Sequence, residues 1–564
     1  MSTVDPSDPP TAGRVPGDRR RRWAAAALTG LAVLVVLLVL VMPSRYGRLT
    51  PAAFIRVPVE ALIAVALLLV VPVRARAVAA TIVGVGLGLL AIVRIFDVGF
   101  FAVLDRPFDP VLDWPFLDSG VVFLSHAYGR TGAVLAVVAA VAVAVGLIAL
   151  TALSVRRLGR IVVRHRPAAA RATIALGVAW VAGALLSVHI VPSVPVAARD
   201  YFDRLGQVRT AVLDRDAFAA EAAVDNFRAT PGADLLTGLR GKDVAIVLVE
   251  SYGRVAFDDP VLEARIGDLL DDGTRRLRAS GFSSRSAFLT SPTAGGGSWL
   301  AEATLRAGVW VDNQQRYRAL PAAGRLMLGA AFQRAGWRTV AIMPGTTEPW
   351  PESSSFGYQK LYGSGDLGYK GPRFSFSTMP DQFALAAFER LERGVPGHAP
   401  VMAEVVLMSS HAPWSPVPEF TDWDKLGDGS VFDETTGAGD DPRLVWSRGL
   451  ERVRSDYGRS IEYSLTTLIS YVERYGDDDL VLVFLGDHQP ASILTGDGAS
   501  RDVPITIVAR DPAVLDQVSG WGWSDGLRPD PAAPVWRMDT FRDRFLTAFG
   551  PPELSAAAPP GAPR

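Results

Sequence analysis

Five apolar runs lie within the first 200 residues and limit what this chain can fold into. A bilayer core of about 30 Å is crossed by roughly 17–25 helical residues. Runs of that length predict a bundle of five transmembrane helices, although the second carries Glu60 and the third is short enough to be a buried or re-entrant helix. The five runs are Trp23–Met42, Val57–Val73, Ala77–Val93, Thr131–Val155 and Ala172–Val191.

Arginines flanking these runs predict the orientation of the chain. With the N-terminus in the cytoplasm, the cytoplasmic segments hold 13 arginines and the outer loops hold six. Positive residues concentrate on the cytoplasmic side of membrane proteins. After five crossings everything beyond residue 199 would be extracytoplasmic. We therefore expect a multi-pass cell-membrane protein with a disordered cytoplasmic tail (1–22), a transmembrane domain (23–198), a juxtamembrane linker (199–240), an extracytoplasmic domain (241–550) and a disordered tail (551–564).

Composition excludes several classes of function. The net charge of −1 argues against a nucleic-acid partner. The chain has no cysteine, which excludes disulfides, thiolate metal sites and cysteine nucleophiles. Charged residues make up 20% of the chain, against about a quarter in soluble proteins, and the membrane helices account for the difference.

Beyond residue 241 the pattern changes to short apolar strands that alternate with helices. Continuous β-branched runs indicate strands buried on both faces, so we expect a mainly parallel sheet between two helical layers, an α/β/α sandwich. The predicted strands are 244–249, 339–343, 401–408, 480–485 and 505–509. The predicted helices are 261–279, 299–307, 321–335, 381–393, 456–475 and 538–549.

Polar residues follow three of these strands, where sites form in sheets of this kind. Glu250 follows the first strand, Asp487 and His488 follow the fourth in GDHQP, and His411 follows the third. A glycine-rich turn, SPTAGGGSW, places Ser298 at the start of a helix.

Together these residues predict a site for one divalent cation. Glu250, Asp487, His488 and the Ser298 hydroxyl form an oxygen-rich set that suits Mn²⁺ first, and also Mg²⁺ or Zn²⁺. The cation would activate Ser298 as a nucleophile, and the helix N-terminus would favour an anionic group beside it. Taken singly, Glu250 could be a solvated strand end, His411 a strand cap and Ser298 an ordinary helix N-cap.

The segments VLVESYG, the glycine-rich turn, HAP and FLGDHQP resemble the sulfatase-type branch of the alkaline phosphatase superfamily. With the N-terminal helices, the chain is similar in layout to lipoteichoic acid synthases and related phosphoglycerol transferases. The resemblance implies that Glu250, Ser298, Asp487 and His488 bind the metal, that Ser298 is the nucleophile, and that His411 contacts the substrate. It also implies an aromatic substrate-pocket residue at Trp350.

The chain departs from that family at two positions. The lipoteichoic acid synthases have threonine where this chain has Ser298, so Thr293 is a rival nucleophile. The arginine expected shortly after the pocket tryptophan is missing, and Arg316 is a candidate for the compensating charge. The absence of a formylglycine motif argues against a true sulfatase, and the absence of cysteine argues against the disulfide-bearing phosphoethanolamine transferases.

These features predict an enzyme that moves a phosphoglycerol, or a similar phospho-alcohol, from a membrane lipid donor to a glycan or glycolipid acceptor. The intermediate would be a seryl phosphate on Ser298. A phosphodiesterase or phosphatase of the same superfamily and a non-catalytic membrane scaffold are the alternatives. The donor headgroup, the acceptor and the oligomeric state are left open by the sequence.

Overall fold

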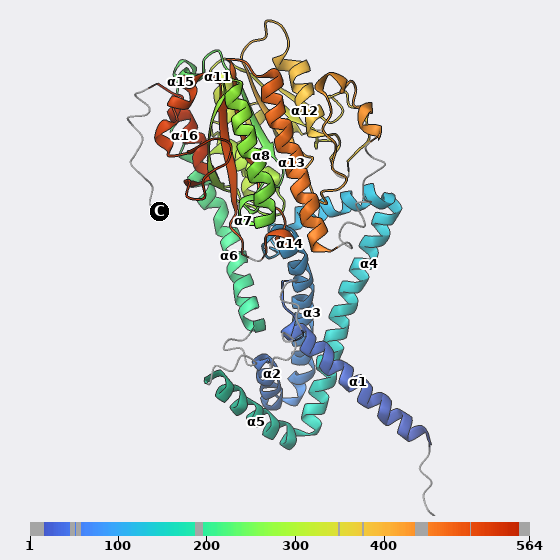
Figure 1. The fold of residues 1–564 in the computed structure, drawn as a ribbon. Helices are drawn as coiled ribbons and strands as arrows, with labels where there is room; N and C mark the ends of the chain where they lie inside the picture. The colour runs from blue at the N-terminus through green and yellow to red at the C-terminus, as the bar shows by residue number, and fades with distance from the viewer. Residues whose placement is uncertain are drawn as a thin grey trace, which may run out of the picture. The chain divides into compact units, whose positions relative to one another are not determined.

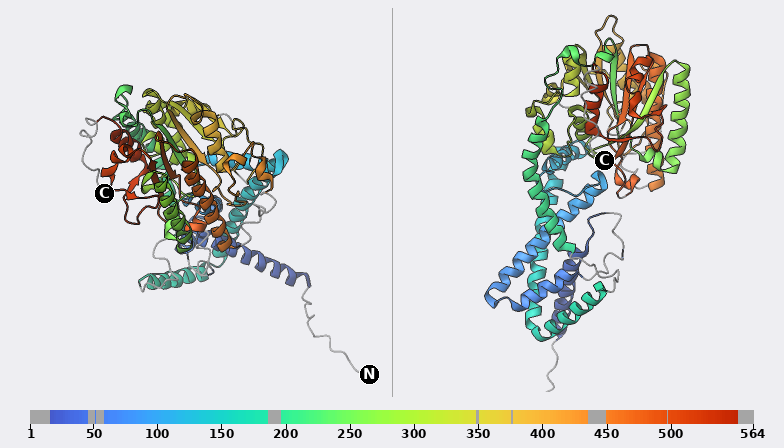
Figure 2. Two further views of the ribbon diagram at one scale, coloured as in Figure 1. Left: turned by 45° about the horizontal axis from the view of Figure 1, so that its top comes forward. Right: turned by 90° about the vertical axis from the view of Figure 1, so that its left-hand side faces the viewer.

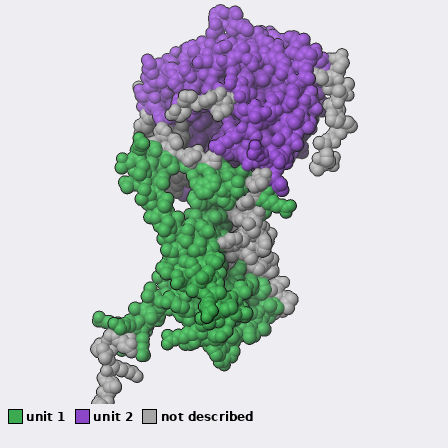
Figure 3. Space-filling view, turned by 180° about the vertical axis from the view of Figure 1, so that it is seen from behind, with its two compact units in different colours: residues 1–101, 106–211 green, residues 102–105, 212–564 purple. Residues whose placement is uncertain are grey.

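The computed structural model describes residues 16–45, 51, 58–185, 196–347, 350–374, 377–434, 449–496 and 498–551. The chain divides into two compact units, the first comprising residues 1–101 and 106–211 and the second residues 102–105 and 212–564 (Figure 3). Of the two predicted tails, residues 1–15 and 552–564 lie outside the described residues. Residues 16–22 of the predicted N-terminal tail are helical, because the first helix begins at Pro16.

Each of the five apolar runs contributes to a helix, but the prediction of five membrane spans is confirmed only in part. Three helical stretches of the described residues are long and apolar enough to cross a membrane: Arg19–Val41, Val73–Leu104 and Gly129–Arg164. The second run forms a helix of 12 residues, shorter than a span, and the end of the fifth run lies outside the described residues. The helices are α1 (Pro16–Val41), α2 (Val59–Val70), α3 (Val73–Leu104), α4 (Trp114–Arg164), α5 (Arg166–Leu185) and α6 (Val196–Ala223).

The described part of the second unit contains one mixed sheet, and most of its strands are parallel. Its strand order is β4-β3-β5-β1-β6-β7-β2-β8, and β9 pairs with β2. The first five strands of this order run parallel to one another, whereas β7 is antiparallel to both β6 and β2. The strands are β1 (Asp243–Val249), β2 (Ser283–Thr290), β3 (Arg338–Met343), β4 (Lys360–Gly363), β5 (Val401–Leu407), β6 (Leu480–Gly486), β7 (Asp502–Ala509), β8 (Ser524–Asp525) and β9 (Val535–Arg537).

Helices cover both faces of this sheet, as the α/β/α prediction requires (Figures 1 and 2). Alternate side chains of β1 point to opposite faces, so Ile246 lies in one hydrophobic core and Val247 in the other. The first core includes side chains of α9 (Ser298–Ala307), α11 (Leu328–Arg334) and α16 (Phe541–Ala548). The second includes side chains of α8 (Pro260–Ala279), α12 (Asp381–Phe388) and α13 (Leu450–Tyr475).

The five predicted strands are all present, whereas four further strands are missing from the prediction. The longest of these, β2, begins with the polar sequence SSRS, which hides the apolar pattern of a buried strand. The main segment of the second unit comprises residues 212–564, and Phe218 and Ala222 at the end of α6 are buried in its first core. Short helices complete the unit: α7 (Val255–Asp258), α10 (Gln314–Ala319), α14 (Ser492–Thr495) and α15 (Pro512–Asp516).

Candidate active site

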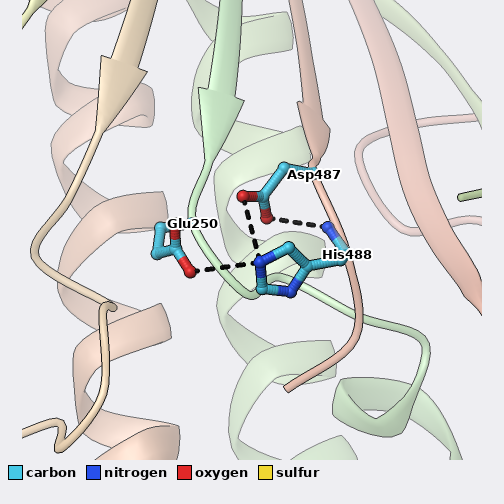
Figure 4. A group of neighbouring side chains, drawn as sticks. All are labelled: Glu250, Asp487 and His488. Carbon is cyan, nitrogen blue, oxygen red and sulfur yellow. Dashed lines mark hydrogen bonds and ion pairs between the residues drawn. The ribbon is translucent and has the colours of Figure 1, made fainter. Parts of the chain in front are cut away.

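Three of the predicted metal ligands converge at the carboxyl ends of two neighbouring strands. Glu250 follows β1, and Asp487 and His488 follow β6. Because β1 and β6 pair in parallel up to Val249 and Gly486, the residues after them are brought side by side (Figure 4). The three side chains are buried, and each offers one ligand atom within 4.8 Å of the others.

Ser298 is the fourth predicted ligand, and the start of α9 brings its hydroxyl to the same group. The helix is preceded by Gly297 in a left-handed conformation (φ 80°), which glycine adopts without steric cost. The Ser298 Oγ lies 3.1 Å from Glu250 Oε2 and 3.2 Å from His488 Nε2. Thus the structure assembles all four residues from three separate parts of the chain.

The His488 ring is oriented with a lone pair toward this cluster. Its Nδ1 lies 2.8 Å from the carbonyl oxygen of Gln489, which can only accept a hydrogen bond, so Nδ1 carries the proton. In the neutral ring Nε2 then bears the lone pair. That atom lies 3.4 Å from Glu250 Oε1 and 3.5 Å from Asp487 Oδ2. A lone pair facing two carboxylates is unfavourable unless positive charge is added.

The pKa values of the three ligands show the same demand for positive charge. Burial, followed by the charge of Glu250, raises the pKa of Asp487 to about 7. Burial also favours the neutral form of Glu250, but the charges of His488 and His411 outweigh it and hold the pKa of Glu250 below its usual value. Burial lowers the pKa of His488, yet the charges of Asp487 and Glu250 prevail and raise it.

The donor set fits a divalent cation. Two carboxylates, an imidazole nitrogen with its lone pair turned inward and a hydroxyl are ligands that Mn²⁺, Mg²⁺ and Zn²⁺ accept. A cation held by Glu250, Ser298, Asp487 and His488 would relieve the repulsion between the two buried carboxylates.

Other polar groups hold these ligands in place, and the sequence did not single them out. Ser251 donates from its backbone N–H to Asp487 Oδ1 and from its hydroxyl to Glu250 Oε1, both at 2.8 Å. Ser291 donates to the backbone carbonyl of Asp487 at 2.7 Å. Ser251 has a φ of 58°, which is uncommon for residues other than glycine. Its position directly after Glu250 is the one signal that could have identified it.

The hydroxyl of Thr293, the rival nucleophile, is directed elsewhere. It donates to the carbonyl oxygen of Gly296 at 2.6 Å and so braces the glycine-rich turn. Of the two hydroxyls, that of Ser298 makes the hydrogen bonds to the ligand cluster.

His411 lies in the turn after β5 and is half-buried. Its Nδ1 donates to the carbonyl oxygen of Ala412 at 2.7 Å. The influence of His411 on the pKa of Glu250 indicates that the two side chains are electrostatic neighbours. The preceding residue, Ser410, donates from its hydroxyl to the backbone carbonyl of Glu250 at 2.6 Å, which ties this turn to the cluster.

The two remaining predicted residues lie in different surroundings. The half-buried Trp350 ring stacks near Phe356, and the guanidinium of Arg306 lies 5.6 Å from the Trp350 ring centre. The structure does not bring Arg316 to the cluster, because its guanidinium binds Asp214 of α6 at 2.5 Å. The cation beside Trp350 is therefore Arg306, one of the residues that the sequence did not single out.

Comparison with known families supports the fold of the domain that carries this cluster. A family model described as Sulfatase matches residues 297–500, which include Ser298, His411, Asp487 and His488. This segment is sulfatase-like. The predicted resemblance to sulfatases is thereby confirmed over this segment. No curated protein matches the chain.

Several solved structures resemble the chain at low sequence identity. The lipoteichoic acid synthase LtaP from Listeria monocytogenes is 15% identical, with 48% of this chain and 66% of that chain covered and a TM-score of 0.34. The phosphoglycerol transferase GacH from Streptococcus pyogenes is 14% identical, with 63% and 87% covered and a TM-score of 0.36. The periplasmic domain of EptC from Escherichia coli, in complex with zinc, is 12% identical, with 57% and 86% covered and a TM-score of 0.36. At these identities and TM-scores the likeness says nothing about substrate.

Proposed function

We propose that the protein is a membrane-anchored, metal-dependent transferase that moves a phosphoglycerol or similar phospho-alcohol group from a lipid donor to an extracytoplasmic glycan or glycolipid. One observation carries the proposal. The Ser298 hydroxyl, at the start of a helix, contacts both Glu250 and His488 in a cluster that fits a divalent cation. A hydroxyl in that position is suited to nucleophilic attack on phosphorus.

We propose that the cation is Mn²⁺ and that it would be held by Glu250, Ser298, Asp487 and His488. When bound, the cation would lower the pKa of the Ser298 hydroxyl and offset negative charge on the phosphoryl oxygens. The backbone amides at the N-terminus of α9 would stabilise the same oxygens. The left-handed φ values of Gly295 and Gly297 give the turn before this helix a shape that few other residues allow.

The reaction would proceed in two displacements. First, Ser298 Oγ, which has already released its proton to solvent, forms a bond to the donor phosphorus, the bond from phosphorus to the lipid alcohol breaks, and a protonated His411 gives its proton to the departing alcohol. Then an acceptor hydroxyl loses its proton to His411 and bonds to the phosphorus, and Ser298 Oγ leaves. Positioned acid–base catalysis of this kind contributes about 10²–10⁴-fold to the rate. Trp350 would line the pocket for the transferred group.

A lipid donor agrees with the rest of the chain. The three helices long and apolar enough to cross a membrane would keep the enzyme near its donor. With the N-terminus in the cytoplasm, the catalytic domain would face outward, where no ATP is present. An energised lipid phosphodiester would then supply the free energy of transfer.

The full-length protein in lipid nanodiscs, supplied with Mn²⁺ and a fluorescent phosphatidylglycerol, tests this proposal. We expect fluorescent diacylglycerol to be released, a phosphoglycerol adduct on Ser298 in peptide mass spectra, and label transfer to a glycolipid when one is added. Diacylglycerol release without transfer to any acceptor hydroxyl would favour the hydrolase instead.

Two serine variants provide the matched comparison. Ser298→Ala should abolish both diacylglycerol release and the adduct. Ser280→Ala removes an exposed hydroxyl in the same domain and should leave both unchanged. Full cellular function of Ser298→Ala would favour the non-catalytic scaffold and rule out catalysis through this residue.

A further inference from the structure

A buried aspartate binds each end of β5, the strand that leads to His411. At the amino end, Asp243 Oδ1 accepts the backbone N–H of Val401 at 2.9 Å. At the carboxyl end, Asp381 Oδ1 accepts the backbone N–H groups of Met408 and Ser409 at 2.7 and 2.8 Å. Both aspartates are at least nine-tenths buried, with 5% of Asp243 and 1% of Asp381 exposed.

Further hydrogen bonds make Asp381 a junction between three elements. It is the first residue of α12, and its backbone N–H donates to the Ser409 hydroxyl at 2.9 Å. Its Oδ2 accepts the hydroxyl of Ser464, in the middle of α13, at 2.6 Å. The carboxylate thus fixes the end of β5 to both helices, and a buried carboxylate with this many donors holds its neighbours in one arrangement.

The segment fixed in this way ends at the site. The Ser410 hydroxyl donates to the backbone carbonyl of Glu250. The backbone N–H of His411 donates to the backbone carbonyl of Met408 at 3.0 Å. Only Ser410 therefore lies between His411 and Ser409, whose amide is bound by Asp381. Misplacement of a catalytic group by about 1 Å can cost about a hundredfold in rate.

We propose that Asp381 is a positioning residue that acts through His411 by fixing the turn after β5. The proposal rests on the proposed function for its kinetic consequence, but the fixing of the turn is a property of the folded chain alone. Asp243 is the natural control, because it accepts one backbone hydrogen bond from the same strand, at the amino end of β5, away from His411.

Hydrogen exchange on the full-length, Mn²⁺-loaded protein tests the structural step without any turnover. Asp381→Ala should speed exchange of the amides in residues 408–414, while residues 244–250 stay as protected as in the wild type. Asp243→Ala should speed exchange near Val401 and leave 408–414 unchanged. Unchanged exchange of 408–414 in Asp381→Ala would overturn the proposal, even if the wild type proved inactive on phosphatidylglycerol and the proposed function failed.

Kinetics test the link to His411. Asp381→Ala should lower kcat about 10–100-fold with little change in KM, because the turn is misplaced while the metal ligands are kept. The double variant Asp381→Ala/His411→Ala should be no slower than His411→Ala, since the same contribution is lost once. Additive losses, or an equal loss of kcat in Asp243→Ala, would reduce Asp381 to a structural residue and overturn the proposal.

A conservative variant covers the case in which the alanine variant does not fold. Asp381→Asn keeps an oxygen for the two amides and can donate to the Ser464 hydroxyl, which is able to accept. It should retain kcat within about threefold, as expected when hydrogen bonds are replaced rather than lost. A loss in Asp381→Asn as large as that in His411→Ala would contradict a role based on those two amides.

Discussion

Removal of the Arg306 side chain should destabilise the second unit strongly. Arg306 lies two turns after Ser298 on α9 and has 2% of its side chain exposed. Its Nε lies 2.9 Å from both carboxylate oxygens of Glu404 in the middle of β5, and its Nη2 lies 2.6 Å from Glu302. Tyr358 donates to the same Glu404 carboxylate, and burial keeps the pKa of Tyr358 well above its usual value.

The magnitude follows from what Arg306→Met would leave behind. Glu404, of which 2% is exposed, would lose the guanidinium that pairs with it, and breaking a buried ion pair on one side costs about 3–5 kcal/mol. Domains of 150–250 residues lose about 2–4 °C in Tm per kcal/mol. The second unit is larger, so we expect a fall on the order of 5–10 °C.

Thermal unfolding of the full-length protein in detergent, followed by intrinsic tryptophan fluorescence, would measure the fall in Tm. EDTA in the buffer would remove any contribution of bound metal to Tm. The triple variant Arg306→Met/Glu404→Leu/Tyr358→Phe replaces the arginine, Glu404 and Tyr358 by apolar groups and leaves Glu302 in place. It should recover at least half of the lost Tm, since replacing a buried ion pair by apolar groups is often neutral. A fall of less than about 2 °C in Arg306→Met, or a triple variant as unstable as the single one, would refute the reasoning.

Changes of pH and of two residues in or next to the predicted metal cluster should affect it directly. Because the pKa of Asp487 is raised to about 7, a cation that binds at lower pH must displace the proton of Asp487. The apparent Mn²⁺ affinity, measured by calorimetry, should therefore fall as the pH drops below 7. The variant Asp487→Asn should bind Mn²⁺ weakly at every pH. The same raised pKa means that Asp487 in the metal-free protein favours folding below about pH 4 and that this contribution is lost as pH rises toward 7. With EDTA present, the Tm of the wild type minus that of Asp487→Asn should therefore fall across that range, and a difference that rises would contradict the assignment. Gly486→Ala would place a Cβ 1.8 Å from the carbonyl oxygen of Tyr252, so the end of β6 before Asp487 must shift. The Mn²⁺ affinity of this variant should fall at least tenfold. The control variant Gly520→Ala has open space around its Cβ position and should bind Mn²⁺ as the wild type does.

The fold of the second unit could be predicted because its central strands are buried on both faces and are apolar throughout. The strands before Glu250 and Asp487 are of this kind, and their ends identified the cluster. The interpretation of the five apolar runs was less successful, because apolar length does not fix where a helix begins and ends: the second run forms only the 12-residue α2. The strand β2 was missed for the opposite reason, since polar residues such as Arg285 interrupt its pattern.

What the sequence could not supply were contacts between residues far apart in the chain. Arg316 was a reasonable candidate for a charge near Trp350, yet it pairs with Asp214 about a hundred positions earlier. Arg306 lies beside Trp350 instead. Arg306 follows Ser298 by eight residues, which places the two on one face of α9. This spacing could have pointed to Arg306 only after Ser298 had been chosen as the candidate nucleophile.

This helix couples the stability of the fold to its chemistry. Ser298, Glu302 and Arg306 recur at intervals of four residues on α9, so one face carries the hydroxyl of the metal cluster at its start and the buried cation at its end. The negative charge of Glu250 favours the protonated form of Glu302, as burial does, and the Arg306 guanidinium opposes both. The cluster and the ion network therefore form one electrostatic system, in which the arginine offsets part of the buried negative charge that a cation at the cluster would also offset. A change at Arg306 should for that reason alter Mn²⁺ affinity as well as Tm, although Arg306 binds neither the metal nor Ser298.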